Sequence, residues 1–240
     1  MKSAADGKRR IKKEVISEGI AAAWPICVGY VPIGAAFGVL AQKAGMTPSE
    51  IGLMSLIVFA GSSQFIAVSM ISAGASAFSI IITTFAVNLR HLLMSSSLSI
   101  FLRRLSRIKL AAFAYGVTDE SFAVNYVRFK SGGWDFQRAL IVNQLPNVIW
   151  IISTVAGGYF GRFIPSGAYG IDYALIAMFI CLLVYQLKGG KYILTAVISG
   201  GTATILAIMV PGNSYIVLAS VFAATTGIIF NRNSRPGRGS

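Results

Sequence analysis

Two apolar stretches of this chain carry polar side chains near their centres. The first contains Gly61-Ser62-Ser63-Gln64, and the second contains Asn88-Leu89-Arg90-His91. Hydrocarbon offers no water to such groups, so each of them must face protein or a water-filled cavity. Polar groups in two neighbouring apolar stretches therefore predict a site for a polar ligand or an ion.

Around the second motif, four polar residues share one face of a predicted helix. They are Thr84, Asn88, His91 and Ser95, at positions i, i+4, i+7 and i+11. His91 is the only histidine of the chain, and near neutral pH its ring can donate, accept or titrate. An alternative is that Arg90 and His91 reach the cytoplasmic edge of the membrane. A helix continuing to Arg103 would place His91 roughly 18 Å from that end, which favours a functional role.

A pair of acids occupies the middle of a third stretch. Asp119 and Glu120 lie at the centre of residues 110–127, with Asp119 roughly 15 Å along a helix from Lys109. That distance is about half the thickness of the hydrocarbon core. One interpretation makes the acids proton carriers or partners of Arg90. The other makes them an ordinary solvated loop between two cytoplasmic basic runs, and both interpretations stay open.

The composition is that of a membrane protein. Of the 240 residues 55% are hydrophobic and only 12% are charged, whereas soluble domains have about 25% charged residues. The mean hydropathy is +0.70. The net charge of +13 could indicate nucleic-acid binding, but the basic residues other than Arg90 are confined to the two tails and a few loops. That distribution marks the cytoplasmic side of a membrane protein, so we expect cytoplasmic termini and no nucleic-acid partner.

We expect an all-α polytopic membrane protein, with about six full transmembrane helices and two re-entrant segments. Residues 1–18 form a basic tail, residues 19–230 the transmembrane transport domain, and residues 231–240 a second basic tail. Segments 51–73 and 110–127 are expected to enter and leave on one side, because basic residues would otherwise fall on both sides. The first would turn at Gly61-Ser62-Ser63. The full spans are expected at 19–42, 77–101, 139–160, 173–187, 191–209 and 213–230.

Small residues mark two faces that suit close helix packing. Gly34 and Gly38 are four apart in the first span, and Ser199-Gly200-Gly201-Thr202 lies in a later one. Packing inside the chain explains the first pair most simply. Both faces could also receive a small hydrophobic subunit. Cys27 and Cys181 form no spacing motif, so neither a metal site nor a disulfide framework is expected.

Four motifs in order resemble the AzlC family, the azaleucine-resistance permeases for branched-chain amino acids, over about residues 20–230. They are Pro32-x-Gly34-x-x-Phe37-Gly38, Phe59-Ala60-Gly61-Ser62-Ser63-Gln64-Phe65, Asn88-Leu89-Arg90-His91 and Thr118-Asp119-Glu120. The resemblance implies a multi-pass exporter in the bacterial inner membrane that acts with a small AzlD-type membrane subunit. It implies transport of apolar amino acids and no catalysis.

On this interpretation the site residues fall into two groups. Substrate-binding groups, which would contact the polar ends of the amino acid, are Ser62, Ser63, Gln64 and Asn88. Groups for a proton relay or charge pairing are Arg90, His91, Asp119 and Glu120. No cofactor is expected. The sequence contains no nucleotide-binding P-loop motif, so transport would be driven by a gradient such as that of protons, or by another subunit.

Two other functions remain possible from the residues alone. An intramembrane hydrolase could use Ser62 or Ser63 as nucleophile with His91 as base. Such sites place a glycine after the nucleophile, however, and here Gln64 follows Ser63. A channel for another small solute is the second possibility.

Overall fold

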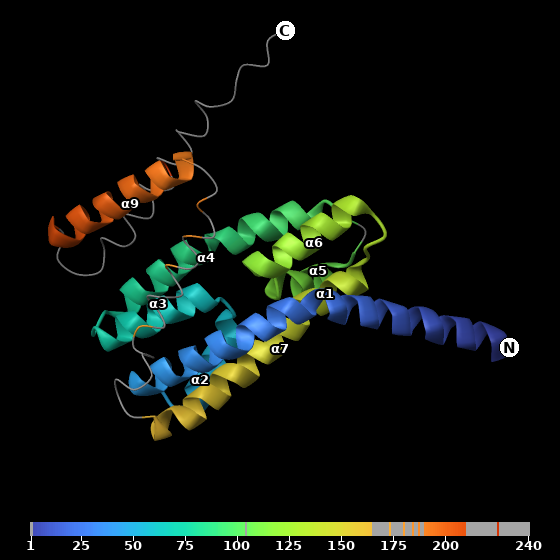
Figure 1. The fold of residues 1–240 in the computed structure, drawn as a ribbon, viewed down its shortest axis with the longest axis horizontal. Coiled ribbons are helices and arrows are strands. Elements are labelled where there is room, and N and C mark those ends of the chain that lie inside the picture. Colours follow the sequence, from blue (N-terminus) through green and yellow to red (C-terminus); the bar gives the residue numbers. More distant parts are fainter. Residues whose placement is uncertain are drawn as a thin grey trace, which may run out of the picture. The chain divides into compact units, whose positions relative to one another are not determined.

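All secondary structure in the described part of the chain is helical. The computed structural model describes residues 2–103, 105–164 and 190–209, and single positions at 173, 180, 184, 187 and 225. Its helices, drawn in Figure 1, are α1 (Lys2–Lys43), α2 (Pro48–Val58), α3 (Gly61–Ser72), α4 (Ala77–Ser99), α5 (Arg107–Tyr115), α6 (Asp119–Ser131), α7 (Phe136–Phe160), the 3₁₀ turn η1 (Gly161–Phe163) and α9 (Gly190–Met209). Apart from those single positions, the spans expected at 173–187 and 213–230 and the tail 231–240 lie outside the described residues.

The chain divides into two compact units. The first comprises residues 1–65 and 87–171, and the second comprises residues 66–86 and 172–240. The first unit contains α1, α2, α5, α6 and α7, with the first turn of α3 and the C-terminal half of α4. All site residues proposed from the sequence belong to this unit.

Three helices in the described residues are long and apolar enough to cross a membrane: Lys13–Lys43, Ala77–Ser99 and Phe136–Phe163. Two shorter apolar helices are Pro48–Val58 and Ile193–Leu206. The all-helical membrane fold therefore agrees with the sequence analysis, whereas the number of six full spans stays a prediction. The basic tail and the first span belong to one helix, because α1 runs from Lys2 through Pro25 and Pro32 to Lys43.

The first unit is held together by α1 packing along α7, which lie side by side in Figure 1. Glycines permit this approach. A Cβ added to Gly38 would lie 2.0 Å from the carbonyl oxygen of Thr154, and one added to Gly157 would lie 2.2 Å from that of Ala35. A Cβ added to Gly34 would lie 2.9 Å from the side-chain Cβ of Ser153. The Gly34/Gly38 face therefore packs inside the chain, and the expectation that it receives a second subunit is wrong.

The segments expected to be re-entrant are each broken into two helices. The first is interrupted at Phe59 and Ala60, between α2 and α3. The expected turn, Gly61-Ser62-Ser63, instead forms the first turn of α3. The second segment is interrupted between α5 and α6, just before the acids, so Asp119 and Glu120 begin α6. Whether either segment returns to the side from which it entered stays a prediction.

Polar and apolar contacts together fix the second break. Leu98, Leu102, Phe113, Val117 and Ala139 form one buried apolar cluster. Beside it, Asn125 Nδ2 donates to Asn143 Oδ1 over 2.9 Å, and Asn143 Nδ2 donates to the carbonyl oxygen of Phe113 over 2.9 Å. Buried amides are costly unless bonded. These bonds therefore tie α6 and α5 to α7.

Candidate functional site

The α2–α3 break has a backbone conformation that side chains seldom adopt. Phe59, the C-cap of α2, has φ 36° and ψ 54°, in the left-handed region. Such a conformation is uncommon for a residue other than glycine and must be held by its surroundings. Phe59 is buried, its ring packs against that of Tyr115, and the Tyr115 hydroxyl donates to the carbonyl oxygen of Leu56. Because Tyr115 belongs to α5, the two broken segments support each other.

At the second break, a capping box starts α6. The backbone N–H of Thr118 donates to Ser121 Oγ over 2.9 Å, and that of Ser121 donates to Thr118 Oγ1 over 3.3 Å. Two acids, Asp119 and Glu120, occupy the first turn. Acidic side chains are stabilised there by the partial positive charge of the helix N-terminus. The local sequence thus explains why the helix restarts at this position.

Arg90 connects the first turns of α3 and α6. Its Nη1 lies 2.6 Å from Asp119 Oδ2, and its Nη2 donates to Ser62 Oγ over 2.6 Å. Arg90 itself lies on α4, about 20 Å from the Ala77 end and about 14 Å from the Ser99 end, so these contacts lie near the middle of an apolar span. Its Nε is buried and has no hydrogen-bond partner among the described residues. This buried N–H donor therefore remains available to a ligand.

Tyr30 completes this cluster from α1, and the sequence analysis did not identify it. Its hydroxyl donates to Glu120 Oε2 over 2.7 Å and lies 3.1 Å from Thr118 Oγ1. Its ring meets that of Trp150 edge-on, with 5.4 Å between centroids. A single tyrosine between Gly29 and Val31 in an apolar helix carries no pattern that reveals such a contact. We call Tyr30, Ser62, Arg90, Asp119 and Glu120 the Arg90 cluster.

Gln64 and Ser63 belong to a different, fully buried group. Trp150 Nε1 donates to Gln64 Oε1 over 2.9 Å, and Gln64 Nε2 donates to Ser55 Oγ over 3.1 Å. The hydroxyls of Ser55 and Thr154 are 2.9 Å apart. Ser63 Oγ donates to the carbonyl oxygen of Ala60 over 3.0 Å. These polar groups are engaged within the protein and connect α2, α3 and α7.

Asn88 and His91 stand outside both groups. Asn88 Oδ1 is buried and has no hydrogen-bond partner in the described part of the chain. His91 is half-buried. Within the described residues, no hydrogen bond joins His91 to Ser62 or Ser63, since Ser62 accepts from Arg90 and Ser63 donates to backbone. The geometry therefore gives no support to a serine–histidine hydrolase.

The Arg90 cluster can bind and exchange charged groups. It holds one cation and two acids, with Tyr30 and Ser62 as neutral hydrogen-bonding groups. Ionisable groups at this depth of a membrane usually serve a ligand or an ion. No cluster of three or more potential metal ligands among His, Cys, Asp and Glu occurs in the residues described. The arrangement suits recognition of a small polar or zwitterionic solute.

Comparison with known proteins gives consistent matches. The model of the AzlC protein family matches residues 25–164. The inner membrane protein YgaZ of Escherichia coli is 30% identical over 81% of this chain and 82% of its own length. The branched-chain amino acid transport protein AzlC of Bacillus subtilis is 28% identical over 81% of this chain and 77% of its own length. An uncharacterised membrane protein of Archaeoglobus fulgidus is 32% identical over 80% of this chain and 84% of its own length. No solved structure matches.

Proposed function

This chain belongs to the AzlC family of membrane proteins, and we propose that it is a secondary transporter that exports branched-chain or similar apolar amino acids. The observation that carries the proposal is the bridging of two broken helices by Arg90, which contacts Ser62 on α3 and Asp119 on α6. Interrupted helices meeting near the middle of a membrane are typical of substrate sites in secondary transporters. We base the choice of substrate on the Bacillus subtilis relative, which is named a branched-chain amino acid transport protein.

Substrate recognition would use the polar atoms that the protein leaves available. Arg90 Nε is a buried donor suited to a carboxylate, and Asn88 Oδ1 is a buried acceptor suited to an ammonium group. The two residues are two positions apart on α4, so their side chains leave the helix on different sides. We assign the carboxylate to Arg90 and Ser62. Asn88 binds the ammonium group at another stage of the cycle. Ser63 and Gln64 shape the site from within the protein.

Coupling to protons would follow from competition for Arg90. When a substrate carboxylate replaces Asp119 as the partner of Arg90, Asp119 loses its counter-ion. A carboxylate without a partner in hydrocarbon binds a proton rather than remaining charged. For export, Asp119 must take this proton from the outer side and give it to the cytoplasmic side when release of the amino acid restores the Arg90–Asp119 pair, so that a proton enters as the amino acid leaves. Glu120, held by Tyr30, and nearby His91 would receive or supply that proton.

We place the protein in the bacterial inner membrane with both termini in the cytoplasm, because the basic residues concentrate in the tails.

We also propose that it acts with a small AzlD-type subunit. The remaining small-residue surface that could receive one is on α9. A Cβ added to Gly200 or Gly201 would meet no atom of the described residues within 4 Å, and such open small residues favour helix association.

The test is efflux of labelled leucine from bacterial cells that produce this chain alone, or together with a small AzlD-type membrane subunit. We expect efflux that depends on the proton gradient, that increases with the subunit and that is lost in Arg90→Ala. A matched control is Arg162→Ala, because Arg162 stacks on Tyr159 and Phe163 and takes no part in the Arg90 cluster. Downhill leucine flux that ignores the proton gradient would favour a channel instead.

A further inference from the structure

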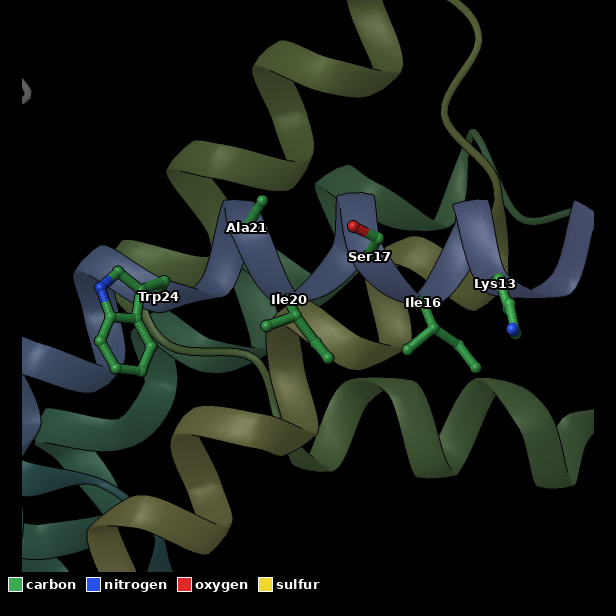
Figure 2. Close-up of a pocket in the computed structure, with 6 residues that line it drawn as sticks. All are labelled: Lys13, Ile16, Ser17, Ile20, Ala21 and Trp24. Carbon is green, nitrogen blue, oxygen red and sulfur yellow. The ribbon is translucent and has the colours of Figure 1, made fainter. Parts of the chain in front are cut away.

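The exposed face at the start of α1 forms a groove for which the proposed transport site has no use. Lys13, Ile16, Ser17, Ile20, Ala21 and Trp24 line a shallow groove of about 630 Å³. Figure 2 shows Lys13, Ile16, Ile20 and Trp24 projecting to the same side of the helix. The groove is polar at its Lys13 end and, apart from Ser17, apolar along the rest of its length. We infer that it binds an anionic phospholipid, with the headgroup phosphate at Lys13 and one acyl chain along Ile16, Ile20 and Trp24.

Charge selects an anionic lipid over a neutral one. Residues 1–18 contain six basic side chains, Lys2, Lys8, Arg9, Arg10, Lys12 and Lys13, against three acidic ones, Asp6, Glu14 and Glu18, for a net charge of +3. Glu18 is paired with Arg138 over 2.6 Å, so its charge is already compensated. Basic residues beside a membrane-spanning helix attract anionic lipid, with about 1 kcal/mol contributed by each of them near the surface.

The length of the helix places the two ends of the groove at suitable depths. The apolar part of α1, Lys13–Lys43, contains 31 residues and is therefore about 46 Å long. This length matches a bilayer of about 40–45 Å that includes its headgroups, so Lys13 lies among the headgroups. Trp24, eleven positions further along, lies about 16 Å deeper. Trp24 is 62% exposed and Ile16 and Ile20 are each 41% exposed, as acyl-chain contacts would require.

Quenching of tryptophan fluorescence by brominated lipids tests this inference. The full-length protein is reconstituted in vesicles that mix phosphatidylglycerol and phosphatidylcholine, with bromine on the acyl chains of one lipid or the other. The signal of Trp24 is the difference between the wild-type protein and Trp24→Phe. This subtraction removes the contributions of Trp134 and the buried Trp150. We expect Trp24 to be quenched several-fold more efficiently by brominated phosphatidylglycerol than by brominated phosphatidylcholine.

Two further variants locate the selectivity. Lys13→Gln should reduce the preference of Trp24 for phosphatidylglycerol about fivefold, which is the effect of about 1 kcal/mol. Lys109→Gln makes the same change of charge at an exposed position on α5. It should leave the preference of Trp24 for phosphatidylglycerol unchanged. Inorganic phosphate should not displace the lipid. Equal quenching by both lipids, or equal effects of the two lysine variants, would overturn the inference. Protection of Trp24 from both lipids would also overturn it, and would indicate a protein subunit in the groove.

Discussion

Arg90 Nη1 lies 2.6 Å from Asp119 Oδ2, which joins a cation near the middle of α4 to the first residue of α6. The neighbouring acid, Glu120, makes a separate contact with the hydroxyl of Tyr30. Two adjacent carboxylates in one helical turn therefore have different partners, one charged and one neutral. This difference gives them separate roles in the transport cycle that we propose.

The first prediction concerns these acids. Asp119→Asn leaves a neutral group beside Arg90, so we expect substrate binding to persist while the dependence of efflux on pH is lost. Glu120→Gln should reduce the rate of efflux and retain its pH dependence. Arg90→Ala should damage both. These outcomes are distinguished by measuring efflux of labelled leucine between about pH 6 and pH 8 and measuring leucine binding separately. Wild-type efflux in both carboxamide variants would mean that the pair is a solvated loop.

The second prediction concerns Tyr30. Tyr30→Phe removes the hydroxyl that contacts Glu120 but keeps the ring against Trp150. A hydrogen bond to a charged group contributes about 1.5–3 kcal/mol, so we expect transport to fall roughly tenfold or more while the amount of folded protein is unchanged. Tyr159→Phe, on an exposed surface of α7, is the control and should transport normally. If both variants behave alike, Tyr30 has no specific role.

The third prediction concerns the contact between α1 and α7. Gly38→Ala and Gly157→Ala would place a methyl group against backbone oxygen atoms. Each should therefore destabilise the protein by about 1–3 kcal/mol. Gly29→Ala, also on α1, would place its methyl group more than 4 Å from any atom among the residues that the structure describes and should be neutral. Thermal unfolding of the purified protein in detergent measures the difference. Equal melting temperatures for Gly29→Ala and Gly38→Ala would contradict the close packing.

The fourth prediction concerns the buried bond between Gln64 and Trp150. Trp150→Phe leaves Gln64 Oε1 without its donor in a fully buried position. An unsatisfied buried acceptor costs about 1–3 kcal/mol, whereas removal of both partners can be nearly neutral. The double variant with Gln64→Met should therefore be less destabilised than the sum of the two single variants. A double-mutant cycle of unfolding free energies measures this coupling, and strict additivity would show that the bond contributes nothing.

The fifth prediction concerns topology. We expect Ser76 to face the outside and Arg107 and Lys130 to face the cytoplasm, because this arrangement agrees with the distribution of basic residues. Single cysteines introduced at these three positions can be probed with a thiol reagent that does not cross membranes, in a background without Cys27 and Cys181. Labelling of Ser76→Cys from the cytoplasmic side alone would exclude a re-entrant segment at 51–73.

Patterns local in the sequence determined the helical membrane fold and the places where helices are interrupted. Low charge and long apolar runs predict spans, and a Thr-x-x-Ser pattern at Thr118 can cap a helix wherever it occurs, because capping involves only neighbouring residues. The depth of Arg90 and Asp119 follows from counting residues along their segments. For this reason the cluster of conspicuous polar residues could be predicted, although the breaks were placed a few residues away from where they occur.

Tertiary structure alone decided which of those residues contact one another. Tyr30 reaches Glu120 across ninety positions of sequence, and Gln64 is enclosed by Trp150, which lies eighty-six positions later. Such contacts depend on how closely α1 and α7 approach, and that distance is set by Gly38 and Gly157 on opposite helices. Each glycine is compatible with many packings when read by itself. The partners of the polar groups therefore became visible only once the helices were packed together.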